Sequence, residues 1–277
     1  MIKKGQLTVF IILALTIAVG GAIGYISIKN NSENNSKNFL NGISIKPGFE
    51  SIRETIISCR DLSTKEAIDE IALRGGFYEK PTKYFDLGIT FVPYYYYEGK
   101  YYLPELSTIE NELSKSVNKK FSTCLNNIKD DNVKLTFNSP KVKSSIIKSS
   151  TSFLIDMSLT MELAKDKLTV QMKDAPIDYK SSLYDIYDVA KYMTESHTED
   201  SYLICISCLT KMADERNLYV DTIDLDKYSQ LVIISENYTK SEPYSFVFMN
   251  KYSDDDYNKN YTLKFDPAPG MPNPNTN

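Results

Sequence analysis

Residues 106–137, LSTIENELSKSVNKKFSTCLNNIKDDNVKLTF, contain both of the patterns that decide the fold class. In the first part, apolar residues recur every three or four positions, which predicts an amphipathic helix. These residues are Leu106, Ile109, Leu113, Val117, Phe121, Cys124 and Ile128. From residue 131 the period changes to two, and Val133, Leu135 and Phe137 alternate with polar residues, as in a half-buried strand. We therefore expect an α+β fold with amphipathic helices and an antiparallel sheet.

The residues before this helix complete a helix–hairpin–helix unit at 47–130. An apolar stripe predicts a helix at 50–74. We expect this helix to end at Gly75-Gly76, because glycine leaves the helical conformation easily. An aromatic hairpin is expected at 89–103, between this helix and the next.

The residues after residue 130 read as an α+β unit at 131–265. Their apolar patterns predict several further elements. These are an antiparallel hairpin at 153–172, helices at 181–195 and 207–217, and strands at 230–235 and 244–249. The tail at 266–277 is rich in proline and asparagine, and we expect it to be disordered.

The four cysteines, Cys59, Cys124, Cys205 and Cys208, are an even number, and such thiols tend to be oxidised outside the cell. Cys59 and Cys124 each lie on the apolar stripe of a predicted helix, so we expect a disulfide across a helix–helix contact. Cys205 would then close locally with Cys208. A redox dithiol and a zinc site are the alternatives for this second pair. The first lacks a surrounding βαβ unit, and a structural zinc site needs four ligands.

Residues 7–28 form one apolar stretch without a charged residue, which as a helix is long enough to cross a bilayer. The basic Lys3 and Lys4 precede it, and a short basic N-terminus is the segment most easily kept inside. We therefore expect a single-pass membrane protein with its N-terminus inside and the bulk of the chain outside. In this interpretation, residues 1–28 are a signal or anchor helix in contact with membrane lipid, and residues 29–46 are a flexible Asn/Ser-rich linker.

The sequence KKGQLTVF, residues 3–10, resembles the class III signal of archaeal type IV pilin-like surface proteins. The resemblance implies that a prepilin-type peptidase cuts between Gly5 and Gln6 and that the apolar helix is retained. A plain uncleaved signal anchor is the alternative. Ordinary signal-peptide cleavage near Ala22 is disfavoured because the apolar run continues through Ile28.

A wider resemblance covers most of the chain. The features Gly-Gly-Phe-Tyr, Val-Pro-Tyr-Tyr, Leu-Pro-x-Leu, the helix ending in Cys124, and Ile-Cys-Ile-Ser-Cys-Leu are similar to those of uncharacterised membrane-anchored surface proteins of small-genome archaea. The resemblance implies a location at the cell surface and brings no activity with it.

Two further sets of residues are candidates for contact and modification. Gly20 and Gly24 have the small-x-x-x-small spacing that lets helices approach closely in lipid, which permits self-assembly through the N-terminal helix. Four asparagines lie in glycosylation acceptor patterns, which would matter if the domain is translocated. They are Asn30, Asn34, Asn237 and Asn260.

Tyrosine is unusually common, with 21 residues and no tryptophan in the chain. The aromatic hairpin concentrates six of them: Tyr94, Tyr95, Tyr96, Tyr97, Tyr101 and Tyr102. Four consecutive tyrosines would occupy both faces of a regular strand. One face is then covered by a helix, as core packing, or offered to a protein or cell-surface partner, because tyrosine suits interfaces.

Composition and motifs exclude several classes of function. The formal net charge is −4 and no basic stripe stands out, which argues against nucleic-acid binding. The single histidine, His197, lies in a polar stretch, and no catalytic, metal-binding or cofactor-binding motif is present, so we expect neither an enzyme nor a cofactor. The expected function is that of a membrane-anchored extracytoplasmic surface protein, as a pilin-like subunit of a filament or surface complex. The alternative is a monomeric tethered adhesion domain that presents the tyrosine-rich hairpin.

Overall fold

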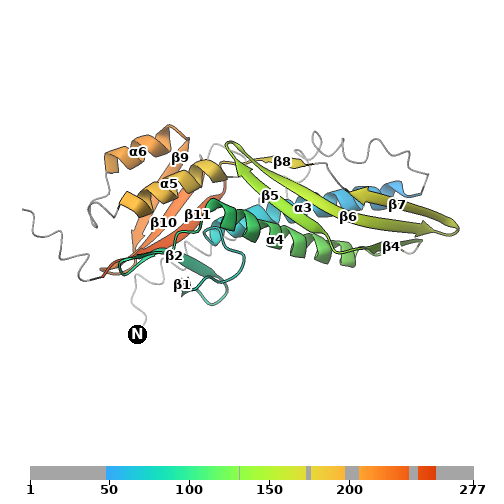
Figure 1. Cartoon of the computed structure of the whole chain (residues 1–277), viewed down its shortest axis with the longest axis horizontal. Coiled ribbons are helices and arrows are strands. Elements are labelled where there is room, and N and C mark those ends of the chain that lie inside the picture. Colours follow the sequence, from blue (N-terminus) through green and yellow to red (C-terminus); the bar gives the residue numbers. More distant parts are fainter. Residues whose placement is uncertain (1–47, 131, 173–175, 197–205, 237–242, 254–277) are drawn as a thin grey trace, which may run out of the picture.

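The computed structural model describes residues 48–130, 132–172, 176–196, 206–236 and 243–253. These residues form two sheets and several helices, which confirms the mixed α+β fold (Figure 1). The helices are α3 (Glu50–Leu73), α4 (Leu106–Asn127), α5 (Leu183–Glu195) and α6 (Ile206–Asp214). Within the described ranges, no helix has the length and apolar character needed to cross a membrane, and residues 7–28 lie outside those ranges.

One sheet, here called sheet 2, is long and narrow. Its strands are β4 (Val133–Phe137), β5 (Lys141–Ile147), β6 (Ser150–Leu163), β7 (Asp166–Met172) and β8 (Ile177–Lys180). β6 is the central strand: β4 and β5 follow each other along one of its edges, while β7 and β8 follow each other along the other. The odd-numbered residues 151–161 of β6 are buried, and the even-numbered ones are partly exposed. This alternation is the one that the sequence predicts.

The other sheet, here called sheet 1, has six strands in the order β1-β2-β11-β10-β9, with β3 paired to β2. They are β1 (Tyr84–Asp86), β2 (Phe91–Tyr97), β3 (Lys100–Tyr101), β9 (Leu218–Asp224), β10 (Ser229–Glu236) and β11 (Ser245–Lys251). All pairs are antiparallel except β2 and β11, which are parallel. The expected antiparallel pairing is thus confirmed for all of sheet 2 and for every pair of sheet 1 except this one. A parallel pair needs a long connection, and here all of sheet 2 lies between the two strands in the chain.

The helices α3 and α4 pack side by side and extend from one sheet to the other (Figure 1). At one end, Ile56 of α3 and Phe121 of α4 pack in a core with Met157 of sheet 2. At the other end, the same two helices share a second core with α5 and with Phe246 and Phe248 of sheet 1. Both cores combine residues from before and after residue 130.

The edge of β5 is closed by α4. The backbone N–H of Ser144 donates to the Ser114 hydroxyl at 2.9 Å, and the N–H of Ile146 donates to the Glu110 carboxylate at 2.8 Å. An open strand edge presents unpaired backbone groups that can pair with another chain. These two contacts give hydrogen-bond partners to two backbone N–H groups on the β5 edge, and they hold sheet 2 against α4.

The turn Gly75-Gly76 ends α3, as predicted. Both glycines have positive φ, and the N–H of Gly76 donates to the carbonyl of Ile71 at 2.8 Å. A Cβ added at Gly76 would lie 2.8 Å from a side-chain carbon of Ile109 on α4. The absence of a side chain at this position therefore sets how closely α3 and α4 approach at the end of their contact.

Replacing Gly76 by alanine should lower the free energy of unfolding by about 2 kcal/mol. The backbone strain of an alanine at positive φ and the clash of its Cβ with Ile109 both destabilise the folded state. The matched control is Gly88→Ala, where φ is also +84° but nothing lies within 4 Å of the added Cβ. It should cost about 1 kcal/mol or less. Urea unfolding of both variants checks this, and equal losses would show that the contact with Ile109 is unimportant.

Candidate functional site

The four consecutive tyrosines of β2 are accommodated by a bulge. Tyr94 lies opposite Met249 of β11, but Tyr96 lies opposite the next residue, Asn250, so Tyr95 is the extra residue in β2. The bulge reverses the alternation of faces. The rings of Tyr94 and Tyr97 accordingly contact each other, with centroids 5.0 Å apart.

Tyr95 is fully buried and joins three parts of the fold. Its ring stacks on Phe248 of β11 with centroids 4.3 Å apart. Its hydroxyl donates to the carbonyl oxygen of Gly75, in the turn after α3, at 3.0 Å. Burial raises the pKa of the Tyr95 hydroxyl well above its usual value. This tyrosine therefore belongs to the core at the junction of α3 and sheet 1.

Most of the tyrosines proposed as interface candidates are not accessible. Tyr94 and Tyr96 are less than 10% exposed, and Tyr97 and Tyr102 are partly buried. Lysine ammonium groups also cover the Tyr97 ring, with Nζ of Lys83 4.4 Å from its centroid. Tyr101, 43% exposed, is the main part of the hairpin that a partner could reach. The burial favours the core-packing interpretation of this segment.

Raising the pH above 10 should destabilise the folded domain. Burial raises the pKa values of Tyr95, Tyr179 and Tyr244 above the usual value of 10. In the unfolded chain these hydroxyls ionise near pH 10, so the stability that they contribute is complete below pH 10 and is lost as the pH rises. The melting temperature should be flat up to about pH 9 and then fall. A Tyr95→Phe variant should show a shallower fall, and an unchanged slope would contradict the role given to Tyr95.

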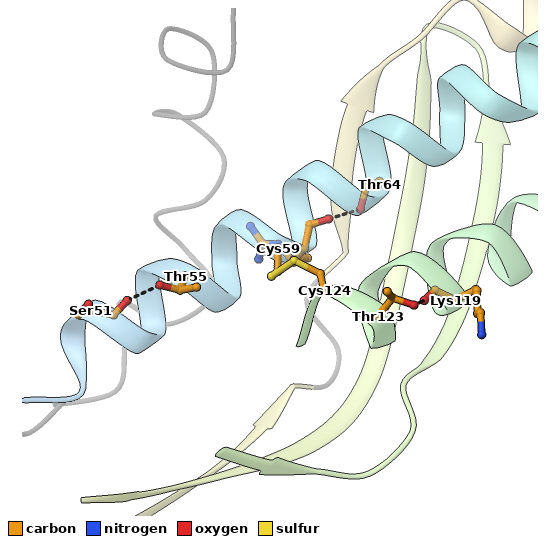
Figure 2. Close-up of a disulfide and its surroundings, with 8 residues drawn as sticks. Ser51, Thr55, Cys59, Thr64, Lys119, Thr123 and Cys124 are labelled. Carbon is orange, nitrogen blue, oxygen red and sulfur yellow. Dashed lines mark hydrogen bonds between the residues drawn. A yellow bond between two sulfur atoms is a disulfide. The ribbon is translucent and has the colours of Figure 1, made fainter. Parts of the chain in front are cut away.

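The disulfide expected between Cys59 and Cys124 is confirmed (Figure 2). It joins α3 to α4, and the two Cα atoms are 5.7 Å apart. Neighbouring hydroxyls bond to their own helices: Thr64 Oγ1 donates to the carbonyl of Arg60, and Thr123 Oγ1 to that of Lys119. Cys205 lies outside the described residues, so its bond to Cys208 stays a prediction.

Two shallow hollows, of about 470 and 420 Å³, lie along the seam between α3 and α4 and meet at Cys124 and the exposed Leu62. Both acidic side chains that line the larger hollow, Glu66 and Glu70, pair with Lys120. The Glu70 carboxylate pairs with Arg74 at 2.5 Å and with Lys120 at 3.3 Å, and it accepts a hydrogen bond from the Ser116 hydroxyl. These contacts hold α3 and α4 together, and they use the Glu70 carboxylate for structure instead of leaving it open to a ligand.

No group of three or more His, Cys, Asp or Glu side chains in the described residues is arranged to hold a metal ion. Several candidate residues fall outside those residues and remain predictions. They are Gly5, Gln6, Gly20, Gly24, Asn30, Asn34, Asn237 and Asn260.

The outer face of sheet 2 is a feature that the sequence analysis missed. It consists of the even-numbered residues 150–162 of β6 and their neighbours on the flanking strands, on the side opposite α3 and α4. Five exposed lysines lie on those flanking strands: Lys134, Lys141, Lys143, Lys167 and Lys180. Within single strands some of them alternate with apolar residues that are buried or partly buried, as Lys134 does with Val133 and Leu135 and as Lys141 and Lys143 do with Val142. This local alternation was the only sign of the face in the sequence.

No known protein family, curated protein or solved structure matches this chain.

Proposed function

We propose that the chain is a membrane-anchored surface protein whose disulfide-bonded α+β domain lies outside the cell. The apolar, uncharged stretch at residues 7–28 carries this proposal, since as a helix it would be about 33 Å long and a bilayer core is about 30 Å thick. Lys3 and Lys4 on its N-terminal side favour an inside location for that end.

The disulfide supports the outside location of the domain. Cys59 and Cys124 are bonded across the helix pair, and structural disulfides persist in oxidising compartments. In a reducing cytosol both thiols would remain free, and the α3–α4 contact would lose its covalent link. The domain is therefore suited to a location beyond the membrane.

Membrane fractionation tests the anchor. The full-length protein should stay with the membrane through a high-pH carbonate wash and be released by detergent. Leu13→Arg with Val19→Arg should abolish this retention, because each arginine at the centre of a membrane helix costs about 2.5–3.5 kcal/mol. The matched control, Leu13→Ile with Val19→Leu, should leave it intact. Retention of the arginine variant would contradict anchoring through residues 7–28.

Protease treatment of intact cells tests the orientation. The domain from residue 48 onward should be digested or shed, while a peptide that contains Lys3 and Lys4 stays protected. A cytosolic protein must remain intact as the control. Protection of the domain in intact cells, with digestion after lysis, would place it inside and contradict the proposal.

The sequence of residues 3–10 favours a pilin-like form of this function, in which the N-terminal helices pack together and the domains form the surface of an assembly. In membranes, cross-linking should then yield oligomers. Gly20→Leu with Gly24→Leu should weaken them, because bulky residues keep the helices apart. Ile12→Leu with Ile17→Leu is the control. Monomers in every case would leave the tethered monomeric domain as the better description.

A further inference from the structure

We propose that the outer face of sheet 2 binds an extended acidic polysaccharide, in which the lysines of the two edges contact its carboxylates and the hydroxyls of the central strand contact its sugars. This inference goes beyond the proposed function and does not depend on the membrane anchor.

The lysines of this face are available to a partner. Lys134, Lys141, Lys143 and Lys180 are exposed and form no ion pair or hydrogen bond in the described residues, whereas Lys167 pairs with Glu162 at 3.2 Å. Elsewhere in the described structure many lysines are paired, as in the contact of Lys115 with Glu79 and Glu112. Four exposed ammonium groups without a partner in the described residues thus lie on one face of one sheet.

Charge on the face is positive although the chain is acidic. Five lysines face outward against three carboxylates, Asp156, Glu162 and Asp178, and the formal net charge of the chain is −4. Each carboxylate already has a partner on the same face: Asp156 accepts from the Gln171 amide at 3.0 Å, and Asp178 accepts from the Ser152 hydroxyl. A ligand would therefore meet excess ammonium groups.

Hydroxyl groups occupy the middle of the face. β6 presents Ser150, Ser152, Ser158 and Thr160 outward, between the lysine-bearing edge strands. Hydroxyls both donate and accept hydrogen bonds, so they suit a ligand that combines hydroxyl groups with anionic ones. Ammonium groups on the edges and hydroxyls in the centre match the chemistry of a sugar-acid polymer.

The shape of the face favours a chain over a membrane. β6 has 14 residues, and at ~3.3 Å per residue the face is about 45 Å long but only about 10 Å wide across its three strands. Sheets twist, so a planar bilayer would contact only part of such a face, whereas a polymer can follow it. Figure 1 shows these strands extending along one end of the molecule. Ile147 is the one large apolar side chain that the face exposes strongly among the described residues.

Single-stranded nucleic acid fits the face less well. Its unselective binding sites combine positive charge with aromatic side chains on which bases stack. The outward positions of β4–β8 carry lysine, serine, threonine, glutamine and acidic side chains together with Ile147 and Leu154, and no aromatic ring is among them in the described strands. The surface therefore provides charge and hydroxyls without a stacking platform.

Binding of polygalacturonate to the full-length protein in a neutral detergent tests the proposal. Affinity measured by calorimetry should fall as salt rises from about 50 to 200 mM, because counterions screen the lysines. Lys134→Ser with Lys141→Ser and Lys143→Ser should weaken binding at least about tenfold and make the salt dependence shallower, as fewer ammonium groups take part. Melting temperature must be unchanged.

The matched control replaces three exposed lysines elsewhere, Lys100, Lys119 and Lys211, by serine, with the same change in net charge. Its affinity should stay within about twofold of the parent, since charges more than a Debye length apart are largely screened. Equal weakening by both triple variants would show a non-specific charge effect and overturn the assignment of the face. Absence of polygalacturonate binding, or binding of anionic lipid vesicles or oligo-dT in its place, would also overturn it.

Discussion

Replacing Tyr95 with serine should lower the free energy of unfolding by about 3–5 kcal/mol, the range for removing a large aromatic side chain from a core. The ring is fully buried, stacks on Phe248 and contacts the edge of Phe246. Its loss leaves a cavity at the point where β2, β11 and the end of α3 meet. The hydroxyl bond to the carbonyl of Gly75 would be lost as well.

Two variants separate the ring from the hydroxyl and from general effects of the hairpin. Tyr95→Phe keeps the ring and should cost about 1 kcal/mol for the missing hydrogen bond. Tyr101→Ser changes a tyrosine that is 43% exposed and should cost much less than Tyr95→Ser. Chemical denaturation of the three variants checks the order. A Tyr95→Ser protein as stable as Tyr101→Ser would contradict the core role of Tyr95.

Removing the disulfide with Cys59→Ser and Cys124→Ser should cost about 4 kcal/mol by the chain-entropy relation. The two residues are 65 positions apart, so the bond strongly restricts the unfolded chain. Cys59 is also 5% exposed and packs in the core of sheet 2. Denaturation under oxidising conditions measures the loss.

Reductant provides the control for this prediction. The parent protein should lose most of the same stability when it is reduced, while the double variant should change little. A parent protein that is equally stable with and without reductant would contradict a stabilising role for the bond.

Helices were predictable where the apolar stripe was long. The pattern from Leu106 to Ile128 predicted α4 almost to the residue, and Gly75-Gly76 fixed the end of α3. The same two stripes also contained the cysteines that pair. These features depend on local periodicity, which a single sequence displays directly.

Strands with weaker patterns were missed. β5 has the sequence KVKSSII, where lysine and serine occupy most positions, and its edge is satisfied by Glu110 and Ser114 of α4. β1, β8 and β9 were likewise not predicted; β1 and β8 are short and β9 has few buried residues. Tertiary contacts stabilise these strands more than their own composition does.

The arrangement of the tyrosines depended on long-range pairing. A regular strand would place Tyr94 and Tyr96 on one face, but the register shift against Met249 and Asn250 puts Tyr94 with Tyr97. The sequence of β2 alone contains no signal for a bulge or for a parallel partner. The lysine face was missed for a related reason, because its lysines gather only when β4, β5, β7 and β8 are aligned beside β6.

The measurement that tests the membrane-anchored account most directly is mass spectrometry of the N-terminal peptide from protein purified out of native membranes. The account predicts a chain that begins at or before Gln6 and so retains residues 7–28. A start at Gln6 would indicate prepilin-type processing and favour the pilin-like form, whereas a start at Met1 or Ile2 would indicate a plain signal anchor. A start beyond Ala22 would mean that the apolar helix is removed, and it would contradict the account.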